Sequence, residues 1–172
     1  MKRKSVFALL LAALVLVPAF TCTAGEKATP QEVYELILRA IPVVEELGKD
    51  GLAAFNDPKG EFVYKDTYVL AVDCAKMVMA AHTNEKLVGK SLKGFLDKNP
   101  DPAKQKEPNQ EMCDAGSKPN GGWTEFYWVQ LGEDKPMRKI NFSIKVPGTD
   151  YTLIAGIYDE NISLDELNAQ LK

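Results

Sequence analysis

The sequence has little of what catalytic and metal-binding sites are built from. It contains a single histidine, His82, and three cysteines that form no CxxC pair. It has no Gly-x-Ser-x-Gly turn around a serine nucleophile, no glycine-rich phosphate loop and no CxxCH haem motif. Nucleophilic catalysis, metal binding and phosphate or haem binding depend on such groups. We therefore expect no catalytic residues, no metal and no cofactor.

Positive charge is also scarce. The chain carries 24 acidic and 21 basic residues, which gives a net charge of −3. Nucleic acids and anionic lipid surfaces attract dense positive charge, and this composition does not supply it. We therefore do not expect nucleic acid as a partner.

A long apolar run occurs only at the N-terminus. Residues 2–4 are basic, residues 6–17 are apolar, and small residues occupy positions 21–24. This order is typical of a secretory signal peptide, and the run is shorter than the roughly 20 residues that span a bilayer. The sequence predicts cleavage after Ala24 and a periplasmic or secreted single domain, residues 25–172, without a membrane span. A retained N-terminal anchor is the alternative.

The cysteines fit this prediction. Cys22 leaves with the signal peptide, so that Cys74 and Cys113 remain. An even pair in an oxidising compartment predicts a disulfide between them. Two buried free thiols are the alternative.

The first part of the expected domain is a helix. Residues 29–32 (TPQE) form a capping box with proline at the first helical position. Apolar residues then recur at helical spacing over residues 33–47, which predicts one apolar stripe. Pro42 should kink this helix, and the glycines at 48 and 51 should loosen its end.

The rest of the chain predicts an antiparallel α+β fold of the PAS-like type. Residues 84–121 are polar and proline-rich, which predicts an insertion of loops and short helices, one of them carrying Cys113. Residues 163–166 (SLDE) form a second capping box that opens a terminal helix. Segments rich in β-branched and aromatic residues predict the strands, at residues 61–65, 67–73, 77–82, 123–131, 137–146 and 151–158.

Several segments, in this order, resemble single Cache domains: residues 55–69, 81–90, 121–128, 138–142 and 146–159. The second begins with AHT and ends with LVGK, similar to the AHP…LVGK element of the family. The third, GGWTEFYW, is similar to its GGWVEYWW strand. The sequence departs from the family at Thr83, where proline is usual, and at Phe126, where tyrosine is frequent.

This resemblance implies a Cache fold in which a long N-terminal helix packs on the sheet and the helical insertion covers a ligand pocket. It also implies extracytoplasmic sensing of small molecules, commonly short carboxylates. The departure at Phe126 removes a hydroxyl, so a contact that tyrosine makes in relatives would be lost.

Strand alternation places Lys139 and Asn141 on one side of residues 137–146 and Ile140 and Phe142 on the other. The apolar side should pack on the long helix. Solvent exposure is the ordinary reading of the polar side. The resemblance instead implies a ligand-facing Lys139, whose ammonium would neutralise a carboxylate.

Aromatic residues and the histidine complete the candidate site. Phe126 and Trp128 share one face of their strand and belong either to the core or to a pocket wall. Tyr68 is a candidate wall residue with a polar tip. His82 is either a neutral ring bonded to nearby backbone or a ligand donor whose charge changes near neutral pH.

Together these expectations describe a non-enzymatic binding module for a small organic acid. It would present its liganded state to a separate, membrane-bound signalling partner. A ligand-free structural or interaction domain of the same fold is the alternative.

Overall fold

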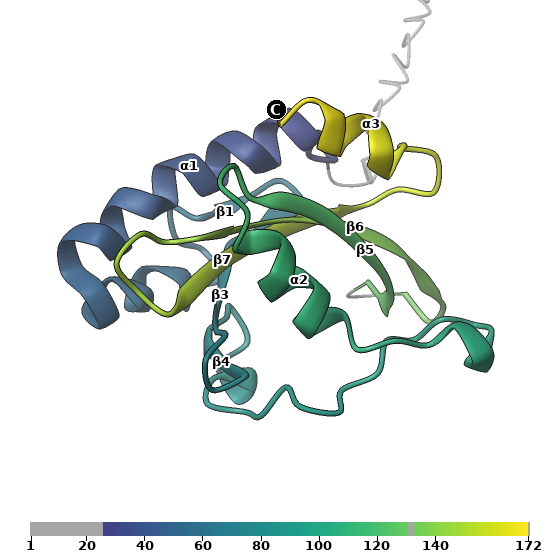
Figure 1. The fold of residues 1–172 in the computed structure, drawn as a ribbon, viewed down its shortest axis with the longest axis horizontal. Helices are drawn as coiled ribbons and strands as arrows, with labels where there is room; N and C mark the ends of the chain where they lie inside the picture. Colours follow the sequence, from purple (N-terminus) through teal and green to yellow (C-terminus); the bar gives the residue numbers. More distant parts are fainter. Residues whose placement is uncertain (1–25, 131–132, 172) are drawn as a thin grey trace, which may run out of the picture.

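Two helical layers cover opposite faces of one antiparallel sheet (Figure 1). The computed structural model describes residues 26–130 and 133–171, so the expected signal peptide lies outside the described residues. Helix α1 (Pro30–Leu47) lies along one face, and α2 (Pro108–Gly116) lies on the other. The short α3 (Leu164–Ala169) joins the layer of α1, where Leu167 enters the same apolar core.

Helix α1 begins as its capping box predicts. The Glu32 backbone N–H donates to Thr29 Oγ1, and the Thr29 N–H donates to the Glu32 carboxylate. The α-helix continues through Pro42 and ends at Leu47, where the residue that follows, Gly48, has a positive φ of 56°. A 3₁₀ helix, Gly48–Phe55, then carries the chain back toward the sheet. The α-helix thus stops before Gly48, and the loosening expected around Gly48 and Gly51 takes the form of a change from α to 3₁₀ helix.

The main sheet has five strands in the order β4-β3-β7-β6-β5, and every neighbouring pair is antiparallel. Its strands are β3 (Leu70–Asp73), β4 (Val78–Ala81), β5 (Gly122–Val129), β6 (Pro136–Lys145) and β7 (Tyr151–Tyr158). Two further strands, β1 (Val63–Tyr64) and β2 (Thr67–Tyr68), form a separate hairpin. The α+β fold class is therefore confirmed.

One expected strand is divided between the two sheets. The sequence predicted a continuous strand over residues 67–73, but Thr67–Tyr68 pairs only within the small hairpin and Leu70–Asp73 pairs with β7. The hairpin turns tightly at Lys65, which has a positive φ of 51°. The Thr67 hydroxyl donates to the Gly156 carbonyl, which fixes the hairpin against β7. Tyr68 therefore belongs to the hairpin and not to the main sheet.

The face of the sheet toward α1, called the helix face, is closed by apolar packing. Val33, Ile37 and Val44 of α1 are completely buried against Ile140 and Phe142 of β6. The Phe142 ring lies edge-on to Tyr34, with ring centroids 5.0 Å apart. The predicted orientation of the apolar side of β6 is confirmed.

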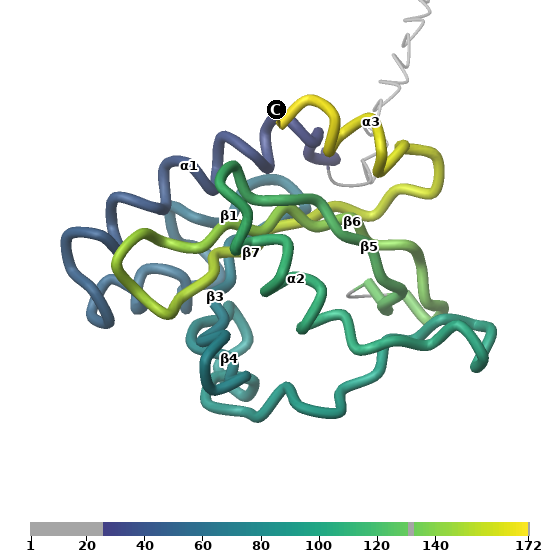
Figure 2. The backbone as a smooth tube through the Cα atoms, in the orientation of Figure 1, coloured from purple at the N-terminus to yellow at the C-terminus, as the bar shows by residue number. Residues whose placement is uncertain are grey.

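The opposite face, called the cavity face, is covered by the insertion at residues 84–121. Its first part pairs with the edge strand β4, where Met79 N–H donates to the Lys90 carbonyl and Gly89 N–H donates to the Met79 carbonyl. The chain then crosses to the other edge of the sheet, as the tube in Figure 2 shows. There Lys98 N–H donates to the Tyr127 carbonyl, and Tyr127 N–H donates to the buried Asp97 carboxylate.

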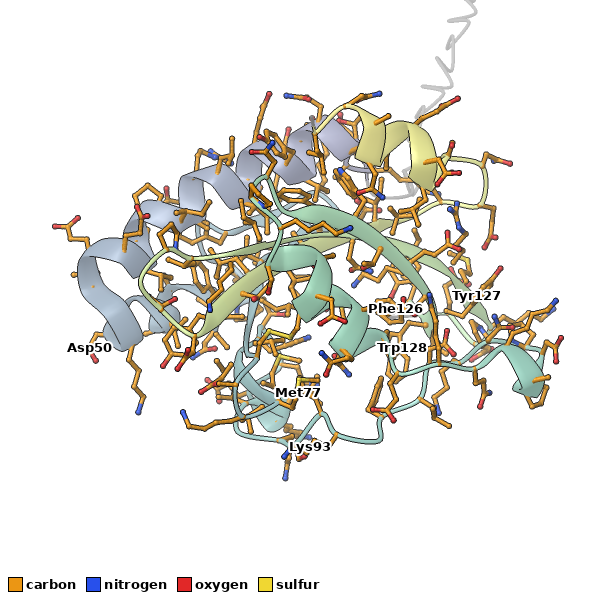
Figure 3. The ribbon with its side chains drawn as sticks, viewed as in Figure 1. Asp50, Met77, Lys93, Phe126, Tyr127 and Trp128 are labelled. Carbon is orange, nitrogen blue, oxygen red and sulfur yellow. A yellow bond between two sulfur atoms is a disulfide. The ribbon has the colours of Figure 1, made fainter. Side chains whose placement is uncertain are left out.

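A disulfide between Cys74 and Cys113 ties α2 to the end of β3, which confirms the predicted pairing. Figure 3 shows it as a yellow bond beside Met77. Because the insertion is attached to both sheet edges and through this bond, it forms a fixed cover.

Candidate ligand-binding cavities

Two adjoining cavities lie on the cavity face. The inner cavity, about 180 Å³, lies between the sheet and the insertion that covers it, which includes α2. The outer cavity, about 420 Å³, is bounded by the β1–β2 hairpin, the chain after β4 and the end of β5. Both cavities share the wall residues Tyr68, His82, Leu87, Trp128 and Lys139. These shared residues form the boundary between the two spaces.

The structure brings every predicted site residue to the inner cavity, which is lined by Tyr68, His82, Phe126, Trp128, Lys139 and Asn141. They come from β5 and β6 of the main sheet, from β2 of the separate hairpin and from the chain that follows β4. The β5–β6 register sets Phe126 opposite Lys139, and the β6–β7 register sets Lys139 opposite Tyr158. Their convergence therefore follows from strand pairing.

Lys139 is a buried cation without an anionic partner. Only 7% of the residue is exposed, and its ammonium makes no ion pair or hydrogen bond with any residue that the structure describes. Its Nζ lies over the rings of Tyr68 and Tyr158, 5.3 and 5.2 Å from their centroids. Burial lowers the pKa of Lys139 to about 8, and the nearby Asp66 charge opposes that shift. The side chain is thus mostly protonated at pH 7, with two π-faces replacing part of its hydration.

The hydrogen bonds of His82 define its tautomer. The Asn84 backbone N–H donates to Nδ1 at 2.8 Å, so Nδ1 is an acceptor and the ring proton lies on Nε2. Nε2 lies 3.2 Å from the Tyr68 hydroxyl oxygen and donates to it. The Tyr68 O–H proton then remains available for another acceptor at the cavity boundary. His82 therefore orients Tyr68.

The surroundings of His82 favour one of its two predicted readings. Burial, together with the neighbouring Lys139 charge, lowers the pKa of His82 to about 4. The ring is therefore neutral across the physiological range and accepts a backbone hydrogen bond, which agrees with the first of the two readings of His82 and not with a charge change near neutral pH. The reason is tertiary, because an ammonium and an apolar wall both disfavour a second positive charge at this place.

Asn141 lies on the floor of the inner cavity and is 2% exposed. Its amide packs directly over Gly156 of β7, where any side chain would collide with Asn141 Oδ1. Its Nδ2 makes only a long contact, 3.4 Å, to the Lys139 carbonyl. A glycine across the strand pair thus leaves room for a buried polar group beside Lys139.

The walls are aromatic and sulfur-rich. Figure 3 shows Phe126 and Trp128 on the side of β5 toward α2, with Tyr127 on the other side. Phe95 from the insertion packs on Trp128 with ring centroids 5.1 Å apart. Phe126 also contacts an apolar cluster that includes Met79 and Met112. Such walls with a few polar groups are typical of small-ligand sites.

Asn109 is the site residue that the sequence reasoning missed. It lies in the first turn of α2, lines the inner cavity and is 6% exposed. The signal for it was present, because Asn109 precedes Cys113 by four residues. Residues at this spacing share a helix face, and the disulfide turns that face toward the sheet.

The described residues contain neither a group of metal ligands nor a membrane-spanning helix. Among residues 26–130 and 133–171, no three His, Cys, Asp or Glu side chains are grouped so as to hold a metal ion. No helix in these ranges has both the length and the apolar character needed to cross a bilayer.

The antiparallel sheet with its long N-terminal helix is the fold of Cache sensor domains. The sequence matches the family Single Cache domain 2 over residues 29–170, and the chain belongs to this family. Cache domains are extracytoplasmic sensor domains that bind small-molecule ligands, and the family is typically non-catalytic. A comparison with curated protein sequences gave no match.

Solved structures of similar fold include two chemotaxis proteins and a Cache chemosensory domain. The periplasmic sensor domain of a chemotaxis protein is 22% identical, with a TM-score of 0.61, and the match covers 76% of this chain and 94% of that one. A methyl-accepting chemotaxis protein from Vibrio parahaemolyticus RIMD 2210633 is 21% identical at the same TM-score, with 77% and 90% covered. A Cache chemosensory domain described for its carboxylic acid recognition is 17% identical, with a TM-score of 0.55 and 76% and 88% covered. At these sequence identities the similarity shows a shared fold and no more.

Proposed function

We propose that this protein is an exported, non-catalytic sensor module that binds a short organic acid in the inner cavity. The observation that carries the proposal is the buried Lys139 ammonium, which faces a cavity and has no anionic partner among the described residues. A buried charge without a partner is costly, and a bound carboxylate would remove that cost.

The size of the inner cavity supports a small ligand. Its volume is about 180 Å³, and an apolar protein cavity of about 150 Å³ is known to hold benzene. The space therefore suits a ligand of about six or seven non-hydrogen atoms. A carboxylate with a short carbon chain has this size.

Each wall residue has a distinct role in this proposal. Lys139 pairs with the carboxylate, and the Tyr68 hydroxyl, oriented by His82, donates a second hydrogen bond to it. Phe126 and Trp128 contact the carbon chain, while Asn141 supplies a polar group on the cavity floor. The carboxylic acid recognition described for one structural neighbour supports the choice of ligand class.

The proposal also covers how the module is placed and used. A signal peptide, residues 1–24, directs export, and residues 25–172 act as one sensor domain in the periplasm or outside the cell. The liganded state is presented to a separate membrane-bound signalling partner. The fold shared with sensor domains of chemotaxis proteins supports such a role.

A ligand screen on the protein purified after expression of the full sequence tests the proposal. The melting temperature is measured with a series of short carboxylates and with neutral, cationic and sugar ligands of similar size. Lys139→Met removes the buried charge, and Lys145→Met is the matched control because Lys145 lies on the same strand and is exposed. We expect carboxylates to raise the melting temperature of the wild type and of Lys145→Met, but not of Lys139→Met.

Two outcomes contradict the proposal. One is a shift that only ligands of another class produce, which would overturn the choice of ligand. The other is the absence of any shift, which would favour a ligand-free structural domain.

A further inference from the structure

The side-chain amide of Asn109 is buried without a hydrogen-bond partner for its nitrogen, Nδ2, among the described residues. Buried amide groups in folded proteins are nearly always hydrogen-bonded, so an exception calls for an explanation. Three other described side chains also have a buried atom without a partner, Asp66 Oδ2, Thr124 Oγ1 and Ser143 Oγ. Asp66 lines only the outer cavity, and the other two line neither cavity. Asn109 differs from them because it borders the inner cavity.

Asn109 lies away from the charged side of the inner cavity. Lys139, Tyr68 and His82 line both cavities and therefore lie at their boundary. Asn109 and Met112 of α2, by contrast, line the inner cavity alone. Many of the other residues that line the inner cavity are apolar, among them Leu70, Met79, Leu92, Phe126 and Ile154. Lys90, Ser91 and Asn141 also line only the inner cavity, but Lys90 and Ser91 are exposed, and Asn141 Nδ2 contacts the Lys139 carbonyl. Asn109 is thus the buried amide on the α2 side of the inner cavity.

The amide is also held in place. Pro108 precedes it and fixes the start of α2, and Cys113 ties the same helix to β3 through the disulfide. An ion pair between Lys106 and Glu111, 2.6 Å long, braces the first turn from outside. Asn109 therefore belongs to a helix whose backbone is constrained at Pro108 and at Cys113.

We propose that Asn109 determines specificity, by selecting carboxylates that carry a second hydrogen-bonding group, such as a hydroxyl or carbonyl, away from the carboxylate. This inference rests on the proposed function, in which Lys139 holds the carboxylate. A plain aliphatic acid fills the same space but leaves the Asn109 amide without a partner. Sites built to hydrogen-bond a ligand group discriminate strongly against the analogue that lacks it, because their own polar groups then stay unpaired.

Matched pairs of acids test the inference by isothermal titration calorimetry. Propanoate is compared with 3-hydroxypropanoate, and butanoate with 4-hydroxybutanoate, using the protein purified after expression of the full sequence. For at least one pair we expect the hydroxy acid to bind about tenfold more tightly than its parent acid. Asn109→Leu should abolish that preference and keep or improve the affinity for the parent acid.

Controls separate this role from a structural one. Gln110→Leu makes the same kind of change on the next residue, which is exposed, and should keep the preference of the wild type. If Asn109→Leu does not fold, Asn109→Ala makes the same test with a smaller side chain. A preference that survives both Asn109 variants overturns the inference, as does a wild type that favours the parent acids.

The results also distinguish this inference from the proposed function. If parent and hydroxy acids bind equally and both require Lys139, the specificity role of Asn109 is wrong and the carboxylate site stands. If no acid of either kind binds, both are wrong.

Discussion

The two faces of strand β6 differ in what holds them. On the helix face, Ile140 and Phe142 are fully buried among apolar side chains of α1 and β7. On the cavity face, Lys139, Asn141 and Ser143 are buried almost as deeply, yet they are polar. Alternation along one strand thus produces an apolar core on one side and a polar, hollow layer on the other.

Burial therefore has different consequences on the two faces of the sheet. Apolar burial on the helix face stabilises the fold. The cavity face buries a charge and amides at a cost in stability, and its cover is fixed by a disulfide and by hydrogen bonds to both sheet edges. We expect substitutions on the helix face to affect stability and those on the cavity face to affect binding.

The largest expected effect comes from truncating the helix face. Phe142→Ala should lower the free energy of unfolding by about 4–5 kcal/mol, since the ring is fully buried between Tyr34 and Trp123. The same change at the half-buried Phe126 should cost about 2 kcal/mol or less, because the inner cavity already interrupts its packing. Urea unfolding measures the free energy of unfolding of both variants. Equal losses would contradict the proposed difference between the helix face and the cavity face.

Removing the disulfide should have the next largest effect. Replacing Cys74 and Cys113 by alanine opens a crosslink over a sequence separation of 39 and should cost about 4 kcal/mol. Because the bond anchors the cover, native-state hydrogen exchange should accelerate more in α2 than in α1. Equal acceleration in the two helices would show that the disulfide does not act on the cavity face in particular.

The charge on Lys139 predicts a pH dependence of stability. Its pKa in the folded protein is about 8, below its ordinary value of 10.5. Between these pH values the unfolded chain keeps a proton that the folded protein has released, so the free energy of unfolding rises with pH in this window. The full rise is about 3 kcal/mol. Urea unfolding from pH 7 to 10 should show it in the wild type and not in Lys139→Met, and parallel curves would contradict the buried charge.

The smallest expected effect concerns the bond between His82 and Tyr68. Tyr68→Phe removes the oxygen that accepts the His82 Nε2 proton and should cost about 1 kcal/mol. Tyr64→Phe is the control, because that hydroxyl bonds Glu32 at the surface and should matter less. In the wild type, NMR should find the ring proton on Nε2 and no titration of His82 between about pH 5.5 and 8. Titration within that range would contradict the buried, neutral ring.

Much of the fold followed from local patterns. The capping box at Thr29 and the apolar stripe behind it placed α1, and alternation along β6 assigned its two faces correctly. The strand over residues 67–73 was predicted as continuous because its composition does not change where the chain leaves one sheet for the other. Residues 67–68 pair with β1 across the turn at Lys65, whereas residues 70–73 pair with β7, which is distant in the sequence.

The candidate site was predicted in part. Lys139 and the aromatic residues were named from strand alternation and from resemblance, and they do line one cavity. Asn109 was missed because an asparagine in a polar insertion looks like an ordinary surface residue. The choice between the two readings of His82 could not be made from the sequence, because it depends on burial and on Lys139, which lies far away in the chain and close in space.

Local sequence patterns were sufficient for helix α1, the two faces of β6, the cysteine pair and the family, because these depend on short-range periodicity and on motifs in a fixed order. Only the tertiary structure decided that Lys139 is unpaired, that His82 is neutral and that Asn109 borders the same space as both. The physical reason is that burial and pairing are properties of neighbours, and the neighbours of these residues come from strands, a hairpin and a helix that the fold brings together.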